Sequence, residues 1–283
     1  MACAVMAAAG LLATGCSAER TGGATGMAPP DIAAEPAAPL TGYDGLTGLP
    51  LSAYGTSQQE DVVLFRTNEA LVARCMNGLG HKNYSDRKKP QDDTKTTAER
   101  EAIRPAGAWG YIGGGTAKRL GFHVAITPPV SKGPTGRELK DYNVCWDKAD
   151  EQVPSPTGSK GWKLTQELFG RSFRTAASDS RVVAARKSWS SCMSEAGHPA
   201  DDPEKLSEGF MSARKTTAKE IAAATADESC TRSSNLAGVY FAVLTGYQKQ
   251  LIAANTEVLT GYKKQVRAQV DRAEQLLASS GTA

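Results

Sequence analysis

The chain has 283 residues and a formal net charge of +3, which is too mild to indicate a nucleic-acid-binding protein. Its hydrophobic content of 40% is low for a globular protein, yet the chain is long enough to bury a sizeable core. No apolar run reaches the roughly 20 residues that a membrane-spanning helix needs.

Residues 1–16 are predicted to form a lipoprotein-type signal. The segment is Ala-rich and apolar, and it ends Leu11-Leu12-Ala13-Thr14-Gly15 before Cys16. This resembles a bacterial lipoprotein signal, in which the cysteine is acylated, so Cys16 is the predicted lipidation site. Ala13 stands where such signals usually have Leu, and no Lys or Arg precedes the apolar run. The alternative is therefore an ordinary signal peptide in which Cys16 has no role.

Residues 17–47 are predicted to be a disordered tether. They contain mainly Gly, Ala, Pro and Thr and almost no large aliphatic side chains. Such a segment cannot bury enough apolar surface to offset the entropy lost on ordering. A flexible chain of this length has an r.m.s. span of roughly 30 Å. We therefore expect the folded part, residues 48–283, to stand clear of the lipid headgroups.

The first half of the predicted helical domain covers about residues 57–150. Ser57 and Glu60 make a Ser-x-x-Glu capping box, which predicts a helix from Ser57 to Gly78 or Gly80. Residues 82–108 are predicted to be a charged loop, with short helices at 116–120 and 138–146. Residues 154–156, Pro-Ser-Pro, separate this half from the second.

The second half covers about residues 160–283. Helical spacing predicts a helix over 179–196, a second from Asp202-Pro203 to Cys230, and a long last helix over 240–277. The motif Leu-Thr-Gly-Tyr occurs at 244–247 and 259–262, which places both tyrosines near one stripe and marks close approach of a neighbouring helix at the glycines. The predicted fold is an all-α bundle of about five to six helices with a long C-terminal helix.

A heptapeptide, Cys-Met-x-x-x-Gly-His, occurs twice, at 75–81 and 192–198. Its simplest interpretation makes Cys half of a disulfide, Met a core residue and Gly a left-handed helix cap. The body has four cysteines, an even number that favours an oxidising compartment. Pairing within each half gives Cys75–Cys145 and Cys192–Cys230.

Two alternatives to this pairing remain open. The four cysteines allow cross-paired connectivities as well. The two heptapeptides also suggest a zinc site made from Cys75, His81, Cys192 and His198, because two thiolates and two imidazoles are a common zinc ligand set. We favour the disulfides and expect no metal or other cofactor.

Catalytic signatures are scarce. The sequence lacks a P-loop, Gly-x-Gly-x-x-Gly, Gly-x-Ser-x-Gly and His-Glu-x-x-His. Ser-x-x-Lys occurs at 85–88 and 212–215, but neither Ser-Asp-Asn nor Lys-Thr-Gly accompanies it. We therefore predict that the protein is not an enzyme.

A family resemblance rests on Trp189-x-x-Cys192-Met193-x-x-x-Gly197, followed by Ala226-Asp227-x-x-Cys230. The chain resembles secreted lipoproteins of uncharacterised function from high-GC Gram-positive bacteria such as actinomycetes. The resemblance covers most of residues 57–265. It implies a lipid anchor on the outer face of the cytoplasmic membrane and, often, a genomic setting beside exporter components, but no activity.

Two hypotheses of function follow. The preferred one is a membrane-anchored, extracytoplasmic, non-enzymatic interaction protein whose long C-terminal helix pairs with a protein partner in the cell envelope, such as an export complex. Exposed aromatic residues along that helix would favour it. The alternative is a binding module for a small ligand or cell-wall fragment held near Trp109, Tyr111 and Trp189. A concave pocket with converging polar groups would favour the alternative.

Overall fold

The computed structural model describes residues 26–82, 84, 105–123, 134–212 and 215–280. Within these ranges the secondary structure is helical, and strand-like pairing is limited to one isolated antiparallel bridge between Thr41 and Gly113. The all-α prediction is confirmed. Cys16, the signal segment and most of the predicted loop 82–108 lie outside the described residues.

The described part of the chain forms ten α-helices and one 3-10 helix, more than the five to six predicted. In chain order they are α1 (Gly42–Thr47), η1 (Pro50–Tyr54), α2 (Gln58–Gly78), α4 (Ala117–Leu120), α5 (Gly136–Gln152), α6 (Lys160–Ser178), α7 (Ser180–Glu195), α8 (Pro203–Met211), α9 (Ala218–Ser233), α10 (Leu236–Ala254) and α11 (Thr256–Ser280).

Two of the predicted long helices are each divided in two. The helix expected over 202–230 is α8 and α9, because Thr217 and Glu220 form a capping box that starts a new helix. The helix expected over 240–277 is α10 and α11. It breaks at Asn255, whose side-chain amide donates to the Leu251 carbonyl (2.8 Å) and so replaces a helical backbone bond.

The residues at which helices begin were predicted correctly, whereas the breaks within the two long helices were not. The Ser57–Glu60 capping box is present at the start of α2. Asp179 caps α7, and the Asp202 carboxylate accepts the Glu204 and Lys205 N–H groups at the start of α8, with Pro203 in the first helical position. Each of these side chains satisfies backbone donors that a helix leaves unpaired.

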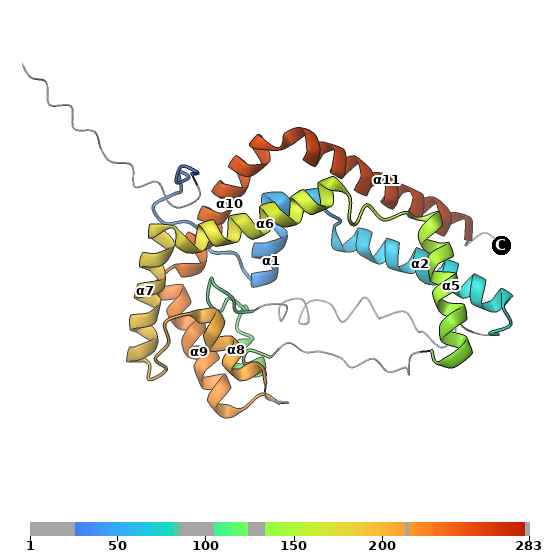
Figure 1. Ribbon diagram of the computed structural model, residues 1–283. Helices are drawn as coiled ribbons and strands as arrows, with labels where there is room; N and C mark the ends of the chain where they lie inside the picture. The colour runs from blue at the N-terminus through green and yellow to red at the C-terminus, as the bar shows by residue number, and fades with distance from the viewer. Residues whose placement is uncertain (1–25, 83, 85–104, 124–133, 213–214, 281–283) are drawn as a thin grey trace, which may run out of the picture.

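The helices form an arch in which α6, α10 and α11 lie along the top (Figure 1). Helices α2 and α5 pack beneath the C-terminal part of α11, and α7, α8 and α9 lie under the other end (Figure 1). Buried apolar residues gather in several clusters along the arch; Ala273 of α11, for example, packs against Leu71 and Val72 of α2. The two sequence halves are therefore not two separate halves in space.

The tether prediction is wrong for residues 26–47. Residues 42–47 are α1, and residues 26–40, here called the strap, lie against α7 and α10. Three side chains donate hydrogen bonds to strap carbonyls: Arg181 to Pro30 (2.7 Å), Asn235 to Pro36 (3.0 Å) and Gln250 to Ala28 (3.0 Å).

The strap can be ordered in spite of its composition because its prolines are themselves the packing groups. Pro30 and Pro36 are buried, and Met27 and Ile32 pack against the central apolar cluster. Gly246 of α10 faces Pro30 so closely that a Cβ at this glycine would collide with the proline ring. Proline also has a restricted backbone, so less entropy is lost when it is fixed.

Candidate functional site

The repeated heptapeptide forms the same helix end in both places. His81 N–H donates to the Met76 carbonyl (3.0 Å) and Gly80 N–H to the Asn77 carbonyl (3.1 Å). In the second copy His198 N–H donates to Met193 (2.9 Å) and Gly197 N–H to Ser194 (3.1 Å). Both glycines have positive φ, so each copy is a Schellman cap.

Both heptapeptides are joined by disulfides to a later helix, as predicted. Cys75 of α2 bonds Cys145 of α5, and Cys192 of α7 bonds Cys230 of α9, with Cα–Cα distances of 5.5 and 5.6 Å. Because these bonds consume the Cys75 and Cys192 thiolates, the alternative zinc site is wrong. Among the described residues, no group of three or more His, Cys, Asp or Glu side chains is placed to hold a metal ion.

The histidines of the two copies differ in their contacts. His81 Nε2 lies 2.7 Å from Asp141 Oδ2 on α5, next to the first disulfide. The hydrogen bond from His81 lowers the pKa of Asp141. His198 is held by its backbone N–H, which donates to the Met193 carbonyl. The first histidine therefore adds a side-chain hydrogen bond to the disulfide-linked helix pair.

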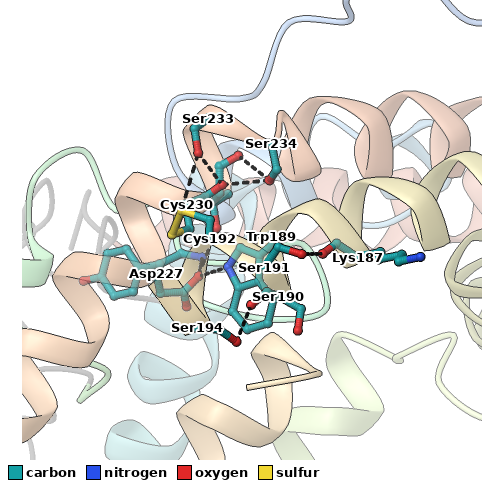
Figure 2. Close-up of a disulfide and its surroundings, with 12 residues drawn as sticks. Lys187, Trp189, Ser190, Ser191, Cys192, Ser194, Asp227, Cys230, Ser233 and Ser234 are labelled. Carbon is teal, nitrogen blue, oxygen red and sulfur yellow. Dashed lines mark hydrogen bonds between the residues drawn. A yellow bond between two sulfur atoms is a disulfide. The ribbon is translucent and has the colours of Figure 1, made fainter. Parts of the chain in front are cut away.

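A buried carboxylate, Asp227 of α9, joins three segments beside the second disulfide (Figure 2). Its Oδ1 accepts bonds from Trp189 Nε1 (2.8 Å), the Tyr111 backbone N–H (3.1 Å) and Thr231 Oγ1 (3.0 Å). Its Oδ2 is buried and accepts no bond from the described residues. Burial raises the pKa of Asp227 to about 6, against the opposing effect of these hydrogen bonds.

A second buried carboxylate, Glu220, holds the turn after α4. Its Oε1 accepts the backbone N–H groups of Phe122 (2.8 Å) and His123 (3.2 Å) and lies 2.6 Å from His123 Nδ1. Glu220 and Asp227 both lie on α9, two turns apart, so together they fix the segment 110–123 along this helix. Both acids therefore have a structural role, because each accepts backbone N–H groups of the segment 110–123.

The three aromatic residues of the small-ligand hypothesis lie in the interior. Trp109 is 3% exposed and packs against Tyr240 and Phe241, while Tyr111 and Trp189 are 0% exposed. Asp227 brings Tyr111 and Trp189 together, but Trp109 lies in a different cluster. The side chains of Trp109 and Trp189 consequently have almost no surface to offer a ligand.

Tyr111 also borders a cavity of about 310 Å³ between the strap and α9. The cavity is lined by two extended segments and by the α9–α10 junction: Ala38, Pro39, Leu40, Tyr111, Ile112, Gly114, Glu228, Thr231, Arg232, Asn235 and Ala237. Its volume is at the low end for small-molecule sites. Four polar side chains border it, and three of them come from the last two turns of α9.

The tyrosines of the C-terminal helices α10 and α11 do not form the exposed aromatic stripe that would have favoured the preferred hypothesis. Tyr240, Tyr247 and Tyr262 are 1%, 4% and 8% exposed. Tyr247 donates to Asp179, and Tyr262 packs against Gly161 of α6. Of the two repeat glycines, Gly246 marks an approach of the strap and not of a helix, whereas Gly261 faces open space.

No protein-family model matches the sequence, and comparison with curated proteins and with solved structures found no match. No helix in the described part of the chain is both long and apolar enough to cross a membrane. What the protein does has therefore to be inferred from its own residues.

Proposed function

We propose that the protein is a lipid-anchored, extracytoplasmic and non-enzymatic interaction protein, held on the outer face of the cytoplasmic membrane through Cys16, that binds a protein partner in the cell envelope. The observation that carries the proposal is the pair of disulfides at equivalent helix ends. Disulfides of this kind persist in oxidising compartments and are rare in the cytosol. The lipoprotein-like signal and the resemblance to secreted lipoproteins support the same compartment.

The internal acids support a non-enzymatic role. Asp227 and Glu220 are the buried carboxylates that would be examined first as catalytic groups. Each already accepts three or more hydrogen bonds that hold the segment 110–123 on α9. A general acid or base needs access to a substrate, and 0% exposure of both residues denies it.

Metabolic labelling with an alkyne-tagged palmitate in a high-GC Gram-positive host tests the anchor. We expect label on the protein and recovery in the membrane fraction, with both lost in Cys16→Ala. Cys3→Ala is the matched control and should behave as the unchanged protein, because residue 3 lies in the predicted removed segment. Membrane recovery of Cys16→Ala, or four free thiols in the body, contradicts the proposal.

The cavity favours the second hypothesis, a binding module. What supports it is a concave site bordered by the polar residues Glu228, Thr231, Arg232 and Asn235, whereas the tyrosines of α10 and α11 are buried and lend no support to helix pairing. We therefore place recognition at the cavity and not on the C-terminal helix. Small-molecule binding and partner binding would use the same site.

A further inference from the structure

We propose that the surface of α7 and α10 that holds the strap, here called the strap site, binds extended proline-rich segments, and that such a segment of a partner polypeptide displaces the strap. The proposal rests on the proposed function, because it names the chemistry of the partner. It also extends the proposed site, since residues 38–40 of the strap form one wall of the cavity and Asn235 borders both.

Burial along the strap recurs every three residues. Pro30 and Pro36 are buried and Met27 and Pro39 are partly buried, at positions that differ by multiples of three. Three residues make one turn of a polyproline II helix, so a segment of that kind places such positions on one side. Within the strap, which the structure describes in full, Ile32 is the one further residue that is not exposed, and it precedes a bend. The strap is therefore recognised along one side.

The strap runs antiparallel along α10. The Ala28 carbonyl accepts from Gln250 in the last turns of α10, and the Pro36 carbonyl accepts from Asn235 at its N-cap. The two donors are 15 positions apart and the two acceptors eight. Fifteen helical residues rise about 22 Å and eight polyproline II residues about 25 Å. These lengths agree, which indicates an extended strap.

Two glycines of α10 receive the two buried prolines. A Cβ at Gly246 would collide with the Pro30 ring, and a Cβ at Gly238 would collide with the Pro36 carbonyl oxygen. The glycines are separated by about two turns of α-helix, and the prolines by two turns of polyproline II. The spacing of small residues on α10 thus matches the spacing of prolines in the bound segment.

Arg181 of α7 is a preorganised donor in the strap site. Its Nε and Nη2 donate to the Asp179 carboxylate (2.9 and 2.8 Å), which also accepts from Tyr247 of α10 (3.0 Å). Its Nη1 donates to the Pro30 carbonyl (2.7 Å). Proline has a carbonyl but no N–H, so a surface that offers donors suits a proline-rich segment.

The strap is attached in a way that allows it to leave. No backbone–backbone hydrogen bond joins residues 26–40 to the rest of the described chain, and ten of these fifteen residues are exposed. The folded body follows the strap at Thr41. Release of the strap therefore requires no helix to unfold.

The surface beneath the strap favours exchange over simple release. Met27 and Ile32 pack against the cluster that contains Tyr240, Phe241 and Tyr247 of α10, and water would reach this apolar surface if the strap left. A proline-rich segment covers it again and offers carbonyls to the same donors. A helical segment has its own carbonyls already hydrogen-bonded, so it does not satisfy these donors.

Fluorescence anisotropy tests the proposal with the full chain carrying Cys16→Ala, so that binding does not depend on the anchor. The probe is a labelled peptide with the sequence of residues 26–40. A tethered strap competes at an effective concentration in the millimolar range. We expect saturable binding to the chain with its own strap and binding at least about tenfold tighter to Pro30→Ser/Pro36→Ser, in which the strap is released. A peptide with the same two replacements is the matched probe and should not saturate.

Variants of the strap site, made in the chain with the released strap, locate the binding. Gly246→Ala and Arg181→Gln should each weaken binding of the probe about tenfold, through collision with the proline ring and through loss of a charged donor. Gly261→Ala, which faces open space, and Lys187→Gln, which is exposed on α7, are the matched controls and should leave binding unchanged. Circular dichroism checks that each variant keeps its helices.

Displacement is measured in the chain with its own strap. The added peptide keeps the strap residues that are not exposed and has Ser at every other position, so its fragments differ in mass from those of the strap. We expect it to bind within about threefold of the first peptide, because the exposed side chains point away from the strap site. It should also speed amide hydrogen exchange across residues 26–40, as followed by mass spectrometry.

The proposal is overturned by absence of saturable binding to the chain with the released strap, by binding that Gly246→Ala leaves unchanged, or by strap exchange that the added peptide does not speed. A dimer that forms as protein concentration rises and is lost in Pro30→Ser/Pro36→Ser would also overturn it, in favour of straps exchanged between copies. Palmitate labelling is independent of these measurements, so failure of the anchor and failure of the strap site are distinguishable.

Discussion

At the scale of single residues, Asp227 makes stability depend on pH in an unusual direction. A folded-state pKa of about 6, raised from 3.8, means that the folded protein binds this proton more tightly than the unfolded chain does. The contribution of Asp227 to the free energy of unfolding is therefore fully present below about pH 4. It decreases as the pH rises through 6 and no longer changes above about pH 7. The loss amounts to about 3 kcal/mol of unfolding free energy.

Asp227→Asn should remove this dependence. The amide oxygen can still accept from Trp189, Tyr111 and Thr231, but the side chain does not ionise. We expect the free energy of unfolding of the unchanged protein to fall between pH 4.5 and 7, and that of Asp227→Asn to fall by about 3 kcal/mol less. Urea titrations followed by circular dichroism at several pH values measure both. Parallel pH profiles would contradict the assignment.

Other acids act in a different pH range. Hydrogen bonding to Arg267 lowers the pKa of Glu60 to about 2, and the pKa values of Asp141 and Asp179 are lowered as well. The stability that these three groups contribute is present above their unfolded-state pKa values, near 4, and is lost in stronger acid. Their contribution is therefore lost below the pH window in which Asp227 acts, and comparison with Asp227→Asn separates Asp227 from other groups that titrate within it.

Local motifs were predictable at the residue scale, whereas long-range polar contacts were not. The Ser57 capping box, the Asp202-Pro203 helix start and the glycine caps each depend on residues within a few positions. Asp227, by contrast, accepts from residues 38 and 116 positions away. Its only sequence signal was its place within the Ala-Asp-x-x-Cys motif, and nothing in that spacing indicates the partners.

At the scale of elements, the strap is held by a match between its prolines and small residues on α10. Its ordering could not be predicted from composition, because the composition of residues 26–40 describes the segment but not the surface that receives it. Arg181 of α7, Asn235 at the N-cap of α10 and Gln250 of α10 donate hydrogen bonds to the strap carbonyls. The same composition without those helices would be expected to remain disordered.

The two Leu-Thr-Gly-Tyr repeats provide a matched test of the strap. Gly246→Ala should displace Pro30 and speed amide hydrogen exchange across residues 26–40, because its Cβ would occupy the position of the proline ring. Gly261→Ala faces open space, so it should leave the strap protected and raise stability by up to about 1 kcal/mol through helix propensity. Hydrogen exchange followed by mass spectrometry measures the difference. Equal exchange in the two variants would contradict this account.

At the scale of the whole molecule, stability depends on two disulfides placed in separate apolar clusters. Cys145 packs with the residues of α2 and α5, and Cys230 with those of α7. The bridges close separations of 70 and 38 residues, for which loop entropy predicts about 4 kcal/mol each. The buried residues form several clusters along the arch instead of one large core, so we expect the disulfides to supply a large share of the stability.

The double variants Cys75→Ser/Cys145→Ser and Cys192→Ser/Cys230→Ser should each lose about 4 kcal/mol of unfolding free energy. Because the two bridges share no cluster, the losses should be additive in the quadruple variant, which would leave it largely unfolded. Denaturant titration with and without reductant measures these values. An unchanged melting temperature after reduction of both bridges would contradict the assigned role.

The docked strap also changes how far the protein can stand from a membrane. If Cys16 carries the lipid, nine residues (17–25), or ten residue steps, lie between it and Gly26, where the described strap begins. Ten residue steps extend to at most about 36 Å, and a flexible chain of that length averages about 18 Å. The arch would then be confined within one protein diameter of the bilayer, so that it could engage partners beside the membrane but not at a distance across the wall.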